Sequence, residues 1–162
     1  MTAQQQPQQH LSAVPTAATQ QRPGRAGEWT IDQIITTLSR PLPKTMTATR
    51  KQGGKELTYI PWHVANKILD KYAIGWSWSI TQINLTSDRI FVTGKLTIPS
   101  AEGDVSREAT GTELLKEEKT NKQTGEITVN EIAYGDPSSN AESMAFRRAA
   151  ARFGLGLYLY DK

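Results

Sequence analysis

The chain has 162 residues, of which 37% are hydrophobic and none is cysteine, and its 19 Lys and Arg against 16 Asp and Glu leave a net charge of +3. The lack of cysteine excludes disulfides, thiolate metal sites and cysteine nucleophiles. The mildly basic total is a weak signal, so local clustering of cations matters more. No apolar run is long enough to span a bilayer and the N-terminus has no apolar signal segment, so we expect a cytoplasmic protein without a membrane partner.

The first 27 residues predict a disordered tail. They are rich in Gln, Pro, Ala and Thr and have almost no large apolar side chains. Such a segment cannot bury enough surface to offset the entropy of ordering. Residues 28–162 are long enough for one hydrophobic core, and we expect them to form a single domain.

The first part of this domain predicts a helix, a hairpin and a second helix. Residues 29–38 have the apolar spacing of a helix, with a capping threonine near their start. Residues 44–50 and 55–60 read as two strands around a glycine pair. A proline opens the second helix, expected over residues 61–75, and a glycine ends it.

Antiparallel strands dominate the next part of the chain. Alternating segments at residues 76–85, 89–98, 107–119 and 127–135 predict a meander of three or four strands. Strands that are neighbours in sequence favour antiparallel pairing, with one face of the sheet covered. We therefore expect an α+β fold in which the meander packs on a long C-terminal helix, with the hairpin and shorter helices preceding it.

The last helix carries the most informative pattern. Asp136 and the proline after it mark its start, and Gly154 is placed where a helix usually stops. At 100° per residue, Arg147, Arg148 and Arg152 fall within an arc of roughly 140°. Compensation of the helix dipole, worth about 0.3–1 kcal/mol, explains one or two cations near a helix C-terminus. Three on one arc favour contact with the phosphates of a polyanion.

A second group of cations lies near the predicted hairpin turn. Arg50, Lys51 and Lys55 flank the glycine pair, and they are equally consistent with a solubilising tip and with phosphate contact. Tyr59 follows on the second strand, where it could stack on a base or pack in the core, and base rates favour packing.

Signatures of catalysis are missing from the sequence. Neither a phosphate-binding loop nor a dinucleotide-binding glycine motif occurs, so we expect no nucleotide cofactor. His10 and His63 stand alone, without a second ligand at metal-binding spacing. A carboxylate pair for metal chemistry could be drawn from Glu113 and Asp136, but lysines interleave the glutamates of this region and favour a solvated hairpin face. We expect no enzyme and no cofactor.

Two segments in this order resemble the DNA-binding domain of the Rad52 family of single-strand annealing proteins. They read YIPWHVANKILDKYAIGWSWSI and, after the meander, AFRRAAARFGLGLYLYDK. The resemblance extends over residues 29–162, and the bacterial branch of DNA-damage-response protein A (DdrA) and phage annealing proteins look closest. It implies a β-β-β-α core and homo-oligomeric rings that hold single-stranded DNA by its backbone in a positive groove, and hence a nucleoid-associated location.

The resemblance also implies site residues. Arg147 and Arg148 match the basic pair of the family's groove-lining helix, and Arg50 and Tyr59 match positions on its first hairpin. The lysine that contacts DNA in the family's meander has two candidate counterparts here, Lys116 and Lys119. Arg152 is one residue beyond the family's next basic position, a step of 100°, so it either reaches the groove or pairs with Glu142 or a neighbouring subunit.

These expectations lead to a principal hypothesis and two rivals. The first is an ATP-independent protein that binds single-stranded DNA and anneals complementary strands in DNA repair and recombination. The second is protection of single strands or DNA ends without annealing, which the DdrA resemblance allows. The third is a metal-dependent nuclease that uses Glu113 and Asp136, which we expect an incubation of labelled DNA with magnesium or manganese to exclude.

Overall fold

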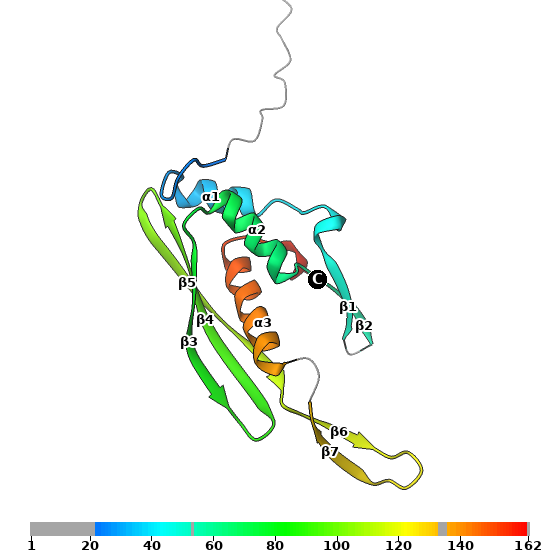
Figure 1. Ribbon diagram of the computed structural model, residues 1–162. Coiled ribbons are helices and arrows are strands. Elements are labelled where there is room, and N and C mark those ends of the chain that lie inside the picture. Colours follow the sequence, from blue (N-terminus) through cyan, green and yellow to red (C-terminus); the bar gives the residue numbers. More distant parts are fainter. Residues whose placement is uncertain (1–21, 53, 133–135, 162) are drawn as a thin grey trace, which may run out of the picture.

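The computed structural model describes residues 22–52, 54–132 and 136–161 (Figure 1). The expected N-terminal tail lies outside these residues up to position 21. The elements are, in chain order, α1 (Ile31–Leu38), η1 (Lys44–Met46), β1 (Ala48–Gln52), β2 (Lys55–Tyr59), α2 (Trp62–Tyr72), β3 (Ser77–Leu85), β4 (Arg89–Ser100), β5 (Gly103–Leu114), β6 (Lys116–Thr120), β7 (Ile127–Glu131), α3 (Pro137–Arg152) and η2 (Leu157–Leu159).

The core lies between a three-stranded antiparallel sheet and α3. The strand order is β3-β4-β5, and α3 packs across β4 and β5. Every second residue of β4 is buried on the helix side, as the two-residue period of a strand requires. The largest fully buried side chains come from α1, α2, β4 and the end of α3, and they include Leu38, Leu69, Leu96 and Phe153. The expected α+β class is confirmed.

Helix α3 begins and ends where the sequence predicts. The carboxylate of Asp136 accepts hydrogen bonds from the Ser138 hydroxyl at 2.6 Å and the Ser139 N–H at 3.4 Å. These two bonds, the first more than the second, lower the pKa of Asp136. At the other end Gly154 adopts a φ of +100°, a conformation that side chains with a Cβ rarely take. Both ends of the helix that carries the arginine cluster are therefore fixed by local sequence.

Close packing of α3 on the sheet depends on small residues from both partners. Ala141, Ala145 and Ala149 recur every four residues and are fully buried. Opposite them on β5 is Gly111, where an added Cβ would lie 1.9 Å from the carbonyl oxygen of Ala141. The backbones of helix and strand thus approach to a distance that only glycine permits.

The strand predicted over residues 107–119 is wrong in one respect, because it is two strands. Strand β5 ends at Leu114, and β6 pairs only with β7, so that a separate two-stranded ribbon stands out from the sheet (Figure 1). Leu115 is the reason: its N–H donates to the carbonyl of Asp88, and its own carbonyl accepts from Ile132. These two bonds turn the chain out of the sheet, and the meander has three strands.

The hairpin and the first two helices occur where the sequence predicts them, although α2 ends at Tyr72, before the expected stop at Gly75. Thr30 forms a reciprocal capping box with Gln33 at the start of α1, and Pro61 precedes the first turn of α2. The first strand begins at Ala48 and not at Lys44, because the preceding residues form the short helix η1, in which Met46 donates to the carbonyl of Pro43.

Candidate nucleic-acid interface

A cavity of about 260 Å³ opens between the β1–β2 hairpin, α3 and the segment that follows α3. We call it the arginine groove. Its polar lining comes from residues of all three elements, namely Arg50, Thr58, Tyr59, Arg147, Arg148 and Tyr160. The structure therefore brings together four residues that the sequence assigned to the site from segments almost 90 positions apart.

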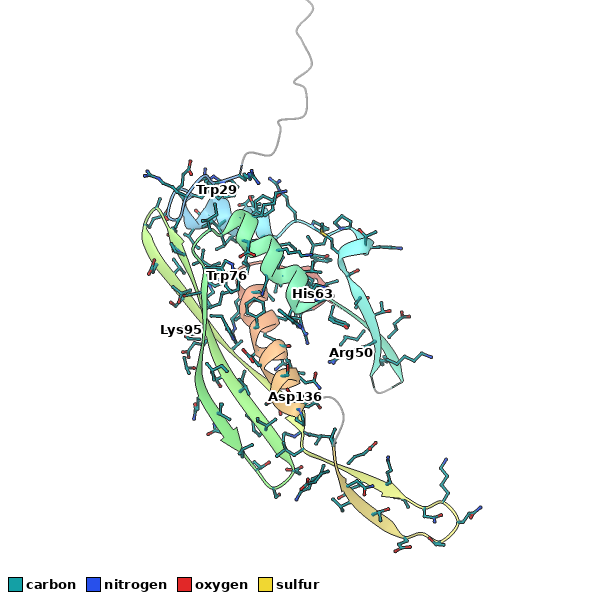
Figure 2. The ribbon with its side chains drawn as sticks, viewed as in Figure 1. Trp29, Arg50, His63, Trp76, Lys95 and Asp136 are labelled. Atoms are coloured by element: carbon teal, nitrogen blue, oxygen red, sulfur yellow. The ribbon has the colours of Figure 1, made fainter. Side chains whose placement is uncertain are left out.

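The ring of Tyr59 lies close to two arginines in the arginine groove. The guanidinium carbon of Arg147 lies 5.2 Å from the ring centre, and that of Arg50 lies 5.8 Å from it. Both distances are within the range of a cation–π interaction. Strand pairing explains the arrangement, because Arg50 is opposite Leu57 and Ala48 is opposite Tyr59, so these side chains share one face of the hairpin. Figure 2 shows Arg50 between the hairpin and α3.

The surroundings of Arg147 lower its pKa. Partial burial is the largest cause that lowers its pKa, and repulsion from Arg50 is the next. The phenols of Tyr160 and Tyr59 act in the opposite direction, and none of the groups that shift this pKa is a carboxylate. Arginine nevertheless remains charged at neutral pH. Neighbouring guanidiniums in a partly buried site gain stability when an anion such as a phosphate enters.

The other two arginines of α3 differ in position. Arg148 donates a hydrogen bond of 2.7 Å to the carbonyl of Thr110 on β5 and lies between the arginine groove and a shallower hollow beside it. Arg152 lines only that second hollow, together with Glu108 and Tyr160. Arg152 is ten residues from Glu142, which corresponds to about 15 Å along the helix axis. The Glu142 carboxylate instead accepts a hydrogen bond from the indole N–H of Trp78. The predicted pairing of Arg152 with Glu142 is therefore wrong.

The hairpin lysines do not share the position of Arg50. Lys51 pairs with Glu56, and this register puts its side chain on the opposite face of the hairpin from Tyr59. Lys55 has the same parity as Tyr59, but it lies beside the turn and is exposed. Neither lysine lines the arginine groove.

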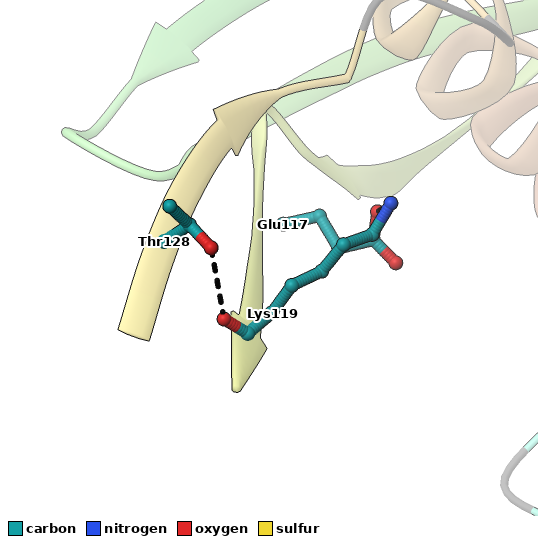
Figure 3. Close-up of polar contacts among 3 residues, drawn as sticks. All are labelled: Glu117, Lys119 and Thr128. Carbon is teal, nitrogen blue, oxygen red and sulfur yellow. Dashed lines mark hydrogen bonds and ion pairs between the residues drawn. The ribbon is translucent and has the colours of Figure 1, made fainter. Parts of the chain in front are cut away.

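Lys116 and Lys119 lie on the projecting β6–β7 ribbon. Lys119 forms an exposed ion pair of 3.3 Å with Glu117, and its carbonyl accepts from the Thr128 hydroxyl (Figure 3). Lys116 is opposite Glu131 in the register of the ribbon. Neither residue lines the arginine groove within one chain. Each lysine also has a glutamate beside it, and this negative charge reduces its attraction for phosphate.

The chain is similar to known proteins over most of its length. A model of the Rad52/22 family of double-strand break repair proteins matches residues 30–162. The chain belongs to this family. It is 35% identical over 132 residues to the DNA repair RAD52-like protein 1, mitochondrial, of Arabidopsis thaliana, an alignment that covers 80% of this chain and 67% of that protein.

A second relative of this Rad52/22-family chain is the DNA repair RAD52-like protein 2, chloroplastic, of Arabidopsis thaliana, 32% identical over 134 residues. That alignment covers 80% of this chain and 60% of the relative. The chain thus spans about two thirds or less of these curated relatives. Both are plant organelle proteins by name, and the bacterial or phage branch stays a prediction.

Sequence reasoning missed part of the groove wall in this Rad52/22-family chain. Leu155, Leu159 and Tyr160 line the arginine groove from the segment after α3. A second glycine with positive φ, Gly156 at +69°, turns the chain back toward the hairpin, and η2 follows directly. The spacing of Gly154 and Gly156 before LYLY was the signal that could have revealed this turn.

Other classes of site are not formed by the described residues. Over residues 22–52, 54–132 and 136–161, no three His, Asp or Glu side chains gather as a metal site requires. Of the two carboxylates considered for nuclease chemistry, Asp136 caps α3 and Glu113 accepts from the N–H of Leu114. No helix in the described part of the chain has the length and apolar character to cross a membrane.

Replacing Tyr59 tests whether its ring holds the two guanidiniums in place. Tyr59→Ala is expected to weaken binding of single-stranded DNA about tenfold, because cation–π contacts contribute roughly 0.5–2 kcal/mol each. Tyr59→Phe keeps the ring and is expected to stay within about twofold of the original protein. Fluorescence anisotropy with a labelled oligothymidine measures both. An equal loss in the two variants would assign the effect to the phenol hydroxyl and contradict this role of the ring.

Proposed function

We propose that this Rad52/22-family chain binds single-stranded DNA in the arginine groove by its phosphates and anneals complementary strands. The observation that carries the proposal is the pair of guanidiniums, Arg147 and Arg50, that both lie close to the ring of Tyr59 in a partly buried groove. Arg148 extends the same cationic surface along α3. A polyanion matches this surface better than any neutral ligand does.

The proposed mechanism needs no covalent step. Bound arginines neutralise phosphates and release counterions, with a log–log salt slope of about −0.7 per phosphate on a single strand. Neutralisation lowers the repulsion between two strands, while bases that are not gripped remain available for pairing. Neither ATP nor another cofactor takes part in such a reaction.

One subunit offers only three groove arginines, so its affinity alone is expected to be modest. We propose that the chain forms a homo-oligomeric ring in which neighbouring grooves hold one strand, each with about four nucleotides, the low end for a single-strand module. Linked sites raise the effective concentration of each successive contact, so the ring binds far more tightly than one subunit.

Two finer assignments follow from the sequence motifs. The order of the Tyr-Ile, His and Gly-Trp positions and the closing arginine pair supports a place in the bacterial DdrA-like or phage branch. A protein of that branch that binds DNA would be nucleoid-associated.

An annealing assay tests the proposed function against its rival. Two complementary oligonucleotides, one with a fluorophore and one with a quencher, are mixed with and without the protein. We expect the protein to accelerate quenching several-fold at saturation of the strands and to do so without ATP. If the protein binds both strands but slows their pairing, it protects single strands and does not anneal them.

A further inference from the structure

Strand β3 is an unprotected edge of the sheet. It pairs only with β4 among the described strands, and of its nine residues only Trp78 is even partly buried. The segment SWSITQINL contains no charged residue and no proline, the two devices that usually prevent an edge strand from pairing with another chain. A strand of this kind is expected to be covered in the working state of the protein.

The inner face of β3 forms an apolar trough, which we call the β3 trough. Its members are opposite the buried positions of β4, so they point to the helix side of the sheet. Helix α3 packs mainly on β4 and β5 and meets β3 at Trp78, which contacts Phe146 and donates to Glu142. The exposed fractions rise along the strand from 45% for Ile80 to 56% for Ile83 and 66% for Leu85. Three large aliphatic side chains on one face of the strand are thus largely exposed.

A cavity lined by aromatic residues lies at the Trp78 end of the β3 trough. Trp78, the first inward residue of β3, also lines a cavity of about 300 Å³ with Trp62, Trp76 and Phe146. The side-chain oxygen of Asn66 lies buried at this cavity, and no donor from the described part of the chain reaches it. A buried acceptor of this kind costs free energy unless a donor reaches it. The cavity and the aliphatic row together describe a docking surface that lies on the other side of α3 from Arg147.

The complementary surface lies on the β6–β7 ribbon. Ile127 and Val129 are two residues apart, so they share one face, and 61% and 56% of their surfaces are exposed. The ribbon stands out from the body of the chain (Figure 1), and every residue of its two strands is exposed. An isolated two-stranded ribbon is at best marginally stable in water. Thr120 and Glu118 of β6 lie opposite Ile127 and Val129 on the same face, which we call the ribbon face. Covering the aliphatic side chains of this face would stabilise the ribbon.

We propose that the ribbon face of one copy of this chain docks in the β3 trough of the next copy. Each surface presents exposed aliphatic side chains, Ile127 and Val129 on the ribbon face and Ile83 and Leu85 in the trough, so one copy of the chain can cover the other. Because the two surfaces differ, the contact is head-to-tail and can repeat around a ring. The N-terminal residues are a poorer occupant, since residues 1–21 have only Met1, Leu11 and Val14 as large apolar side chains. This inference deepens the proposed ring and rests on it.

The test uses paired variants of the full chain. Ile83→Asp with Leu85→Asp disables the β3 trough, and Ile127→Asp with Val129→Asp disables the ribbon face. By sedimentation velocity the original protein is expected to be a multimer and each variant a monomer. An equimolar mixture of the two variants is expected to form a complex of two chains and no larger species, because it contains one intact contact.

A matched control separates the trough from a general effect of charge. Gln82→Asp with Asn84→Asp adds two aspartates to the outer face of the same strand, and this variant is expected to assemble like the original. Assembly of the trough variant, a monomeric original protein, or a mixture that stays monomeric would each overturn the proposal. An original protein that assembles only after residues 1–21 are removed would also overturn it, in favour of these N-terminal residues as occupant.

Cross-linking keeps the test valid if an aspartate variant fails to fold. The chain has no cysteine, so Leu85→Cys and Ile127→Cys can be made as single variants and mixed under oxidising conditions. A disulfide-linked dimer is expected in the mixture and not in either variant alone, and its absence would contradict the contact. Binding of a short oligonucleotide, measured separately on the monomeric variants, reports on the arginine groove, so a failure of DNA binding and a failure of this contact are distinguishable.

Discussion

Replacing Arg147 and Arg148 together with alanine is expected to weaken binding of single-stranded DNA by at least about 100-fold. Hydrogen bonds to charged groups contribute about 1.5–3 kcal/mol each, and 1.4 kcal/mol corresponds to a factor of ten. Two lost phosphate contacts should also make the salt slope shallower by about 1.4, at roughly 0.7 per phosphate. Anisotropy titrations with oligothymidine at several salt concentrations measure both quantities.

The control for this prediction is a cation outside the groove. Lys95 lies on the outer face of β4 (Figure 2), and Lys95→Ala removes one charge while leaving the arginine groove intact. We expect its affinity to remain within about threefold of the original. If the double arginine variant binds as well as Lys95→Ala, the site assignment fails.

Gly111→Ala is expected to be among the most destabilising single changes in the chain. The new Cβ would lie 1.9 Å from the carbonyl oxygen of Ala141 and 2.6 Å from the backbone nitrogen of Ala145. Backbone atoms cannot yield as a flexible side chain does, so α3 must move away from β5. Overpacking of this kind costs about 3 kcal/mol or more, and it would displace the arginines that α3 carries.

Urea denaturation measures the free energy of unfolding of this variant. Glu108→Ala, at an exposed position of the same strand, is the matched control and is expected to change stability by less than about 0.5 kcal/mol. A Gly111→Ala variant as stable as this control would mean that helix and strand are not in close contact at Gly111.

The fold could be predicted where residues close in sequence determine the backbone conformation. The cap at Asp136, the stop at Gly154 and the cap at Thr30 depend on residues close in sequence, and each was predicted. The break at Leu115 depends on hydrogen bonds to Asp88 and Ile132. Those partners are distant in sequence, so no local pattern contained the break, and the alternation of residues 107–119 suggested one strand.

The candidate site, too, could be predicted only in part. Helical spacing alone predicts that Arg147 and Arg148 are neighbours, but their meeting with Tyr59 depends on how the hairpin docks against α3. Clustering in sequence was misleading for Lys51, because a one-residue step along a strand reverses the face. Lys116 was uncertain for another reason, since only the structure reveals that its strand leaves the sheet.

Chemically altered DNA tests most directly whether the arginine groove grips phosphates and leaves the bases free. Affinity would be measured for three oligonucleotides of equal length: a natural strand, one with uncharged methylphosphonate linkages and one with abasic sugars. We expect the methylphosphonate strand to bind at least about 100-fold more weakly, because the contacts to charged groups are lost, and the abasic strand to bind nearly as well as the natural one. Tight binding of the methylphosphonate strand, or loss of binding with the abasic strand, would contradict the account.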